Sequence, residues 1–268
     1  MLKAARQREI VTLLQGGGIV EVATLAARFQ TSPITVRRDL IELQERGVLA
    51  RTRGGAIPGQ EIYTEGWARY ESVSYAEREN VNHRQKRAIA ELAAQSVSDG
   101  DCILINGGTT CRNLAEALRG HHNLHVVTNG LTVAMELGKS RNATVYLLPG
   151  IVDLRKMTSV SRPESGALEN ITVRAAFLGI HGISATSGIS MLTPEEAAMN
   201  RAFVDAAQTV NILVDSSKFQ AQAMFRIAHL EKVTRVFTDD GISDEMLGAL
   251  EKAGVQVSIA HLDESDQQ

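Results

Sequence analysis

The sequence predicts a two-domain protein of the α/β class, in which a small helical domain precedes a larger domain built on a mostly parallel sheet. Three observations lead to this prediction. The chain has 268 residues, of which 44% are hydrophobic, and this is enough for two domains and a sizeable core. Residues 1–57 hold nine lysines and arginines but only five acidic residues, whereas the whole chain has a net charge of −3. From His83 onward, apolar runs alternate with helical patterns, as in parallel sheets with crossover helices.

Three helices are expected in the N-terminal domain. The first spans roughly residues 3–16 and the second about residues 21–29, each with apolar residues at helical spacing. The third is predicted to begin at Ser32 and Pro33, because serine caps helix starts and proline fits the first helical position, and to end at Gly47. The expected buried side chains of this third helix are Ile34, Leu40, Ile41 and Leu43.

A short basic segment, residues 48–57, follows these helices and is expected to form a two-stranded ribbon. Helix, helix, turn, helix and ribbon is the order of a winged helix-turn-helix, whose third helix fits the major groove of DNA. We therefore predict that residues 1–57 bind a double-stranded DNA operator. Arginines pair with guanine edges or phosphates, and hydroxyl groups contact phosphates. The predicted DNA contacts are Thr31, Ser32, Thr35, Arg37, Arg38, Arg51 and Arg53.

Residues 58–82 have no clean period and are expected to form a linker. Residues 83–262 then form the predicted α/β domain, which begins with a helix at about 83–97, and residues 263–268 form a polar tail. The expected strands are 101–106, 124–128, 144–148, 175–180, 210–214, 233–237 and 255–259. The expected helices between them are 111–119, 130–138, 194–207 and 243–253.

A glycine- and threonine-rich loop follows the first strand of this domain and opens a helix. Backbone N–H groups, hydroxyls and the positive helix end would converge there on an anion, although a plain tight turn is the alternative. Further loops follow other strands, and ligands of open α/β sheets bind at the carboxyl edge of the strands. Lys218 offers a charge for a phosphate there, or else a surface ion pair. The predicted ligand contacts are Asn106, Gly107, Gly108, Thr109, Thr110, Thr128, Asn129, Gly150 and Lys218.

Other classes of protein are not expected. The two cysteines, Cys102 and Cys111, are too few for a disulfide framework, and no Cys/His cluster has metal-ligand spacing, so neither a metal site nor a cofactor is predicted. The N-terminus lacks the apolar stretch of a signal peptide, and no run of about 18 apolar residues predicts a membrane span. A cytoplasmic protein is expected.

The third helix and the ribbon carry a specific string of residues. Residues 32–40 read Ser-Pro-Ile-Thr-Val-Arg-Arg-Asp-Leu, and Gly47, Leu49, Arg51 and residues 54–56 (Gly-Gly-Ala) follow. This string resembles the signature of the DeoR-type family of bacterial transcription regulators. The resemblance implies that the helix-turn-helix runs from about Val20 to Asp39. It places the family's arginine pair on Arg37 and Arg38, with Asp39 as a partner that holds them.

The second domain also looks like the sensor domain of this family. The matching residues are Gly108-Thr109-Thr110, Thr128-Asn129, Gly150, Phe177-Leu178-Gly179, Gly182-Ile183, Glu196, Asp215 and Ser217-Lys218-Phe219. The family's sensor fold is similar to ribose-5-phosphate isomerase and glucosamine-6-phosphate deaminase, which implies a phosphorylated sugar or sugar-like effector. Asn106 stands where the family usually has aspartate, and Asn200 stands where lysine is common. The loop at Pro149-Gly150 and the region of Ser161 each lack a frequent glycine. These departures predict an unusual effector.

The function expected from the residues and the resemblance is that of a non-enzymatic repressor. Such a protein would form a homo-oligomer, a dimer or higher, and would release the operator of a carbohydrate or polyol catabolic operon when the effector binds. One alternative is a sugar-phosphate isomerase or deaminase with an appended DNA-binding domain, for which Glu195, Glu196 or Asp215 would supply a base. Another is a helix-turn-helix used only for protein assembly.

Overall fold

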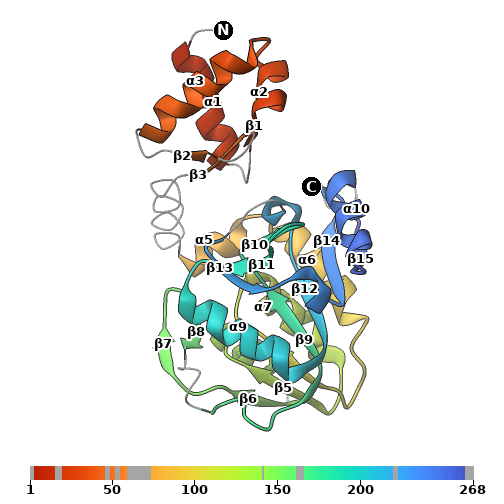
Figure 1. The fold of residues 1–268 in the computed structure, drawn as a ribbon. Coiled ribbons are helices and arrows are strands. Elements are labelled where there is room, and N and C mark those ends of the chain that lie inside the picture. Colours follow the sequence, from red (N-terminus) through yellow and green to blue (C-terminus); the bar gives the residue numbers. More distant parts are fainter. Residues whose placement is uncertain are drawn as a thin grey trace. The chain divides into compact units, whose positions relative to one another are not determined.

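The computed structural model describes residues 3–15, 20–45, 49–51, 55–58, 74–140, 142–160, 166–219 and 223–262 of the chain. The chain forms two compact units, the first drawn mainly from residues 1–73 and the second from residues 74–219 and 223–268 (Figure 1). Each unit has its own hydrophobic core. The predicted fold class is confirmed, because a helix-turn-helix unit precedes an α/β unit with a mostly parallel sheet.

The described residues of the first unit form three helices and a small antiparallel sheet. Its helices are α1 (Lys3–Gln15), α2 (Val22–Arg28) and α3 (Pro33–Glu45). Its strands are β1 (Val20–Glu21), β2 (Leu49–Arg51) and β3 (Gly55–Pro58), which lie in the order β1-β3-β2. Apolar side chains of all three helices, including Ile10, Leu25 and Leu40, form one buried core. The β2–β3 ribbon is the wing of the predicted winged helix-turn-helix, and β1 is an additional strand that the sequence analysis did not predict.

Helix α3 begins where the sequence predicts, but its buried face differs from the prediction. The hydroxyl of Ser32 accepts a hydrogen bond from the backbone N–H of Thr35 at 3.2 Å, which is the contact of a helix cap. Ile34 is 70% exposed and Ile41 is 38% exposed, so the prediction that they are buried is wrong. The buried face consists instead of Val36, Asp39, Leu40 and Leu43. Residues 36, 40 and 43 follow the helical repeat, whereas residue 34 points away from it.

Glycine is required at the start of β3. Gly55 pairs with Glu21 of β1, and a Cβ on Gly55 would lie 2.0 Å from the carbonyl oxygen of Val20. No side chain fits at that distance, so only glycine allows β3 to approach β1 this closely.

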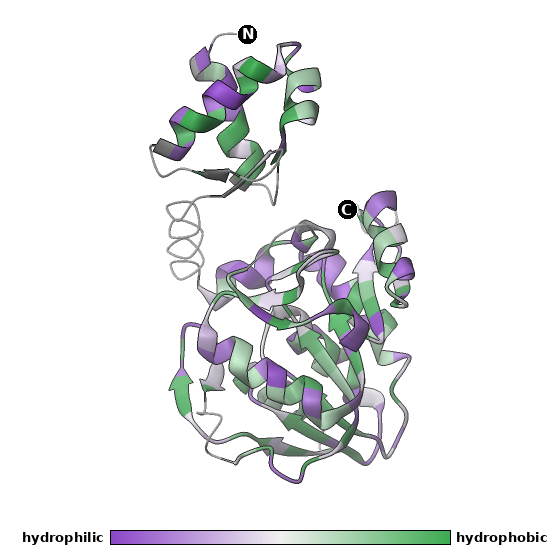
Figure 2. Cartoon of the chain, in the orientation of Figure 1, coloured by the Kyte–Doolittle hydropathy of each residue, from purple (hydrophilic) through white to green (hydrophobic). Residues whose placement is uncertain are grey.

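The second unit is built on a seven-stranded parallel sheet with the strand order β15-β14-β12-β9-β4-β5-β6. All seven strands predicted from the sequence are present in this sheet. In chain order they are β4 (Cys102–Ile105), β5 (Leu124–Thr128), β6 (Ala143–Leu147), β9 (Val173–Gly179), β12 (Ala207–Leu213), β14 (Arg235–Asp239) and β15 (Gln256–Ala260). The strands of this sheet are made largely of hydrophobic residues, whereas the surrounding helices also carry hydrophilic ones (Figure 2).

Helices cover both faces of the sheet. One hydrophobic cluster joins the sheet to α6 (His83–Ala94), α7 (Thr109–Ala117) and α8 (Leu131–Leu137). The other joins it to α9 (Pro194–Ala206) and α10 (Asp244–Lys252). Alternate residues of one strand point to opposite faces, so Ile103 and Ile105 of β4 belong to the first cluster and Leu104 to the second.

Several elements of the second unit were not predicted from the sequence. A three-stranded sheet has the order β10-β11-β13, formed by β10 (Gly182–Ser184), β11 (Gly188–Met191) and β13 (Phe225–Ala228). A hairpin pairs β7 (Ile151–Asp153) with β8 (Thr158–Val160). Its described residues also include the single-turn 3₁₀ helices η1 (Leu118–Gly120), η3 (Ser216–Lys218) and η4 (Leu230–Lys232).

The last part of the predicted linker also folds with the second unit. Helix α5 (Tyr75–Asn80) begins at Ser74, whose side chain and backbone exchange hydrogen bonds with Glu77 as a capping box. Among the helices described, none combines the length and apolar character that a membrane span needs.

Candidate nucleic-acid interface and ligand pocket

The first half of α3 presents polar and basic side chains to solvent. Ser32, Arg37 and Arg38 are exposed, and Thr31 and Thr35 are half-buried. Within the described ranges, neither arginine forms an ion pair. Ile34 adds an exposed apolar group at the start of this helix. The surface therefore combines hydrogen-bond donors, positive charge and one apolar contact, and these are the groups that read base edges in a major groove.

Asp39 does not hold the arginine pair as the resemblance implied. It is 1% exposed, and its carboxylate accepts a hydrogen bond from Nε of Arg6 at 2.5 Å and another from Gln7 at 3.4 Å. The hydrogen bond to Asp39 raises the pKa of the Arg6 guanidinium above its ordinary value. Asp39 therefore links α3 to α1 inside the unit, which leaves Arg37 and Arg38 available to a ligand.

The predicted contacts from the wing lie at the limit of the described residues. The backbone of Arg51 forms part of β2, but its side chain lies outside the described part, and Arg53 lies outside it altogether. A DNA contact at either arginine stays a prediction.

In the second unit, the loops after β4 and β5 meet at the carboxyl edge of the sheet. The backbone N–H of Gly107 donates to Oδ1 of Asn129 at 3.0 Å, and Nδ2 of Asn129 donates to the carbonyl of Ser159 at 3.2 Å. Thr128 is fully buried, and its hydroxyl accepts from the backbone N–H of Gly130. These contacts fix the loop that runs from Gly107 into the N-terminus of α7.

A small pocket opens at this edge. Its lining residues are Asn106, Gly107, Asn129, Thr158, Ser159, Val160, Met191, Glu195, Glu196, Met199 and Asn200. Three of the predicted ligand residues, Asn106, Gly107 and Asn129, are thus brought together. Gly150 is exposed and does not line this pocket. The wall from β8 was missed because the hairpin that carries it was not predicted.

Asn106 uses its hydrogen-bonding groups within the protein. Its Nδ2 donates to the carbonyl of Gly179 at 2.9 Å and to Oδ1 of Asn200 at 2.8 Å. Its Oδ1 accepts from the backbone N–H of Gly179 at 2.8 Å and from the thiol of Cys111 at 3.0 Å. Two of the positions that depart from the family pattern, Asn106 and Asn200, are therefore direct partners. A neutral pair of amides stands where the resemblance implies an aspartate and a lysine.

Basic side chains act on the same buried groups, and we call Arg78, Lys86, Lys156 and Lys218 the cation cluster; Lys156 joins this cluster to the pocket wall. Lys86 of α6 is buried, and its ammonium donates to the backbone carbonyl of Arg78 at 2.5 Å. The pKa of Lys86 is lowered to about 8, mainly by burial; Asp215 opposes the shift, and the charges of Lys218 and Arg78 contribute to it. Lys156 pairs with Glu196 of the pocket wall at 3.3 Å.

The same cations act on a buried histidine. Burial holds the pKa of His181 well below its ordinary value, and the charges of Lys218, Arg78 and Lys156 act in the same direction. His181 is therefore a neutral residue in a positive field, and that field favours an anionic ligand. The sequence analysis identified Lys218 but missed Lys86. A signal for Lys86 was present, since a lysine interrupts the apolar stripe of Ile89, Ala90 and Ala93 on α6.

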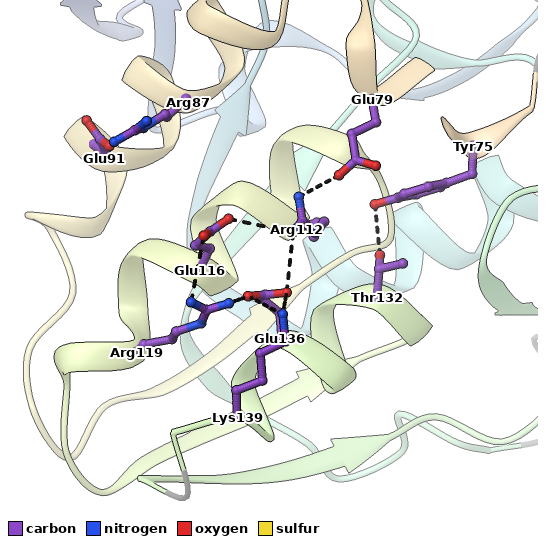
Figure 3. A network of polar contacts seen from close by, with 10 residues as sticks. All are labelled: Tyr75, Glu79, Arg87, Glu91, Arg112, Glu116, Arg119, Thr132, Glu136 and Lys139. Atoms are coloured by element: carbon purple, nitrogen blue, oxygen red, sulfur yellow. Dashed lines mark hydrogen bonds and ion pairs between the residues drawn. The ribbon is translucent and has the colours of Figure 1, made fainter. Parts of the chain in front are cut away.

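An ion-pair network ties α5 to the helices that begin at these loops (Figure 3). Arg112 of α7 lies 2.5 Å from Glu79 of α5 and 3.5 Å from Glu136 of α8, and Glu136 also pairs with Arg119 and with Lys139. The hydroxyl groups of Tyr75 and Thr132 are hydrogen-bonded at 2.9 Å. Burial is the main cause that raises the pKa of Tyr75, so this residue stays a neutral phenol. Helix α5 is therefore attached to both α7 and α8.

Asn106 and the thiol that it contacts do not act as an acid or a base near neutral pH. Burial raises the pKa of Cys111 to about 12, so its side chain stays a thiol, and the Asn106 amide has no proton to exchange near neutral pH. Glu196 accepts a hydrogen bond from Thr193 and pairs with Lys156. In the described part of the chain, no group of histidine, cysteine and acidic residues could hold a metal ion.

Two family descriptions match the chain. The DeoR C terminal sensor domain matches residues 81–240, and the DeoR-like helix-turn-helix domain matches residues 6–59. The putative aga operon transcriptional repressor of Escherichia coli O157:H7 is 27% identical over 94% of this chain and 92% of its own length. The glycerol-3-phosphate regulon repressor of Escherichia coli (strain K12) is 29% identical over 89% of this chain and 92% of its own. Among solved structures, ribose 5 phosphate isomerase A from Neisseria gonorrhoeae is similar with a TM-score of 0.35 and 18% identity, over 51% of this chain and 53% of that one.

Proposed function

The chain belongs to the DeoR family of transcription regulators, and from that premise we propose that it is a DNA-binding repressor of a carbohydrate or polyol catabolic operon, released by a phosphorylated, sugar-like effector. The observation that carries the proposal is the exposed face of α3. Two adjacent arginines without an ion pair in the described ranges stand beside three hydroxyl residues, on a helix whose opposite face is held by a buried core.

Each group of this face has a distinct role in the proposed complex. Arg37 and Arg38 contact guanine edges or phosphates, and Thr31, Ser32 and Thr35 contact phosphates and fix the register. Ile34, which the sequence analysis had assigned to the core, contacts a thymine methyl group. Arg51 and Arg53 of the wing reach the phosphate backbone or the minor groove.

The cation cluster is the proposed site for the phosphate of the effector. Lys86 and Lys218 supply point charges, and the backbone N–H groups and hydroxyls of Thr109 and Thr110, the first two residues of α7, would add hydrogen bonds. A relative of this chain is named for glycerol-3-phosphate, which supports a phosphate ester as the effector.

Helix α5 is the proposed link between effector and operator. The ammonium of Lys86 donates to the carbonyl of Arg78 near the end of α5, so a phosphate that takes this ammonium removes a contact of the helix. Helix α5 is also the first described element of the second unit, directly after the segment that leads from the DNA-binding unit. Such coupling between two sites is typically worth about 1–3 kcal/mol.

We also propose that the protein binds DNA as a homodimer or a higher oligomer. Helix-turn-helix proteins read two half-sites with paired recognition helices, and pairing raises the effective concentration of the second helix. The alternative of an isomerase or deaminase predicts turnover of ribose 5-phosphate or glucosamine 6-phosphate. We expect none, because Glu196 is already paired with Lys156 and the pocket residues Asn106 and Asn200 are neutral amides hydrogen-bonded to each other.

Operator binding tests the proposal. Fluorescence anisotropy would measure the affinity of the full chain for the DNA upstream of its own and neighbouring genes, with and without phosphate esters. We expect tight binding to one fragment, steep weakening with salt and release by one class of ester. Binding with no salt dependence would contradict the DNA-binding role, and an affinity unchanged by a broad panel of esters would contradict the effector role.

A further inference from the structure

Thr158 carries a buried hydroxyl that lacks a partner in the pocket wall. The residue lines the pocket and is 8% exposed, and its Oγ1 has no hydrogen-bond partner among the described residues. Its methyl group lies over Gly107, because a Cβ on that glycine would be 2.2 Å from Thr158 Cγ2. One rotamer step about the Cα–Cβ bond would bring the hydroxyl to the place of the methyl. A buried polar group without a partner is costly, and a ligand hydroxyl would remove that cost.

The floor of the pocket is polar but uncharged. Asn106 and Asn200 are 2% and 4% exposed, and each is hydrogen-bonded to the other. Nδ2 of Asn200 also donates to the carbonyl of Glu196 at 2.8 Å, which leaves Asn200 one N–H and one lone pair for a ligand. Neutral amides pair well with hydroxyl groups and do not compensate a second negative charge.

The mouth of the pocket is acidic. The lining residues include Glu195 and Glu196 but no lysine or arginine. Lys156 neutralises Glu196, whereas Glu195 is exposed and forms no ion pair within the described part of the chain. A second anionic group on a ligand would therefore meet an uncompensated carboxylate. The cations that attract a phosphate lie in the neighbouring cluster, which the Lys156–Glu196 pair joins to this pocket.

We propose that this pocket binds the uncharged, hydroxyl-bearing end of a phosphate monoester, that the Thr158 hydroxyl is one of its hydrogen-bond partners, and that Glu195 disfavours esters with a second anionic group. This rests on the proposed function, since it assumes that the effector is a phosphate ester. It narrows the effector to monophosphates of sugars or polyols, and it excludes bisphosphates and phosphorylated acids.

Two matched pairs of compounds test the specificity. Fructose 6-phosphate is compared with fructose 1,6-bisphosphate, and glycerol 3-phosphate with 3-phosphoglycerate, by isothermal titration calorimetry on the full chain. Within the pair that binds, the member with one anionic group should bind at least about tenfold more tightly, since like-charge contacts and unpaired buried groups cost on the order of one factor of ten.

Two substitutions test the residues. T158V removes the hydroxyl while it keeps the shape, and it should weaken the bound monophosphate about tenfold. Its control is T238V, because Thr238 of β14 also has a buried hydroxyl without a partner but does not line the pocket. E195Q should bring the two members of a pair closer in affinity, and E245Q is its control, since Glu245 is likewise exposed in the first turn of a helix.

The outcomes separate this inference from the proposed function. Equal affinities within each pair, or T158V that binds as tightly as T238V, would overturn the inference while an ester still releases the operator. If none of the four esters binds the chain or changes its operator affinity, the inference fails together with the effector half of the proposed function. Operator binding measured without ester tests the DNA-binding half independently.

Discussion

Asp39 lies inside the first unit, and its substitution separates a structural role from a DNA-contacting one. We expect D39A to lower the free energy of unfolding of this unit by about 3–5 kcal/mol, because it removes the buried carboxylate that pairs with the Arg6 guanidinium. Hydrogen exchange of the α1 and α3 amides would measure the effect. The control is E9A, which removes the exposed pair with Arg28 and should cost less than about 1 kcal/mol. Equal protection in the two variants would contradict the buried link.

Lys86 makes a prediction about pH. Its pKa is about 8, so the charged ammonium that attracts a phosphate is present below pH 8 and is lost as the pH rises above it. The groups that act on it are Asp215, Lys218, Arg78 and Glu79. We expect the affinity for glycerol 3-phosphate, or for the ester that releases the operator, to fall between pH 7 and pH 9. Calorimetric titrations across this range would measure the fall.

Substitution of Lys86 checks the origin of that pH dependence. K86M should abolish ester binding and keep operator binding, whereas K139M, which alters an exposed lysine of the Glu136 network, should retain the ester and its pH profile. The pH dependence of the free energy of unfolding gives a second check. The pKa of Lys86 is lower in the folded chain than in the unfolded one, so its contribution to stability increases from about pH 8 upward. An unchanged pH profile in K86M would sink this account.

Among the secondary-structure elements, α5 is the one whose attachment decides whether binding of the effector changes the affinity for the operator. R112M removes the pairs of Arg112 with Glu79 and Glu136, so α5 loses its ionic link to α7 (Figure 3). We expect unchanged operator affinity without ester and a weaker release by ester. R87M is the control, because Arg87 pairs with Glu91 along one face of α6. A full release response in R112M, measured by anisotropy, would show that this link carries no coupling.

The elements also separate what the sequence predicts from what it leaves open. The seven parallel strands were predicted because each is a short segment rich in apolar residues, and helical patterns lie between most of them. The strands β10, β11 and β13 are only three or four residues long, and β13 pairs with β11 from a distant part of the chain, so no local period marks them. Residues 75–80 were predicted as part of the linker. Helix α5, which they form, buries none of its six residues, so its sequence carries no apolar stripe that would predict a helix.

The candidate site divides in the same way. The loops at Gly107 and Asn129 were predicted from their position after strands, and they do line the pocket. Thr158 comes from the unpredicted β7–β8 hairpin, and the contact between Asn106 and Asn200 spans 94 positions of the chain. The exposure of Ile34 was missed because an isoleucine near a helix start was assigned to the core, although it lies off the stripe of Val36, Leu40 and Leu43.

For the whole molecule, paired reading of an operator requires two copies of the chain on one piece of DNA. We expect analytical ultracentrifugation to give a dimer or a larger oligomer. Half-sites read by paired recognition helices lie about one helical turn, or roughly 34 Å, apart or at multiples of it. Insertion of about half a turn of DNA between them should therefore weaken binding strongly, whereas a full turn should restore part of it. Equal affinity for all three spacings would contradict paired reading.

Operator affinity measured as a function of salt shows whether α3 reads DNA through Arg37 and Arg38. The measurement compares the parent chain, the double variant R37A/R38A and the control R84A/R87A, which removes two basic residues from α6 of the other unit. We expect R37A/R38A to lose specific binding. The slope of its log affinity against log salt should fall by about the contribution of two phosphate contacts, while the control should match the parent. A double variant that binds the operator as tightly as the parent, with the same salt dependence, would contradict the account.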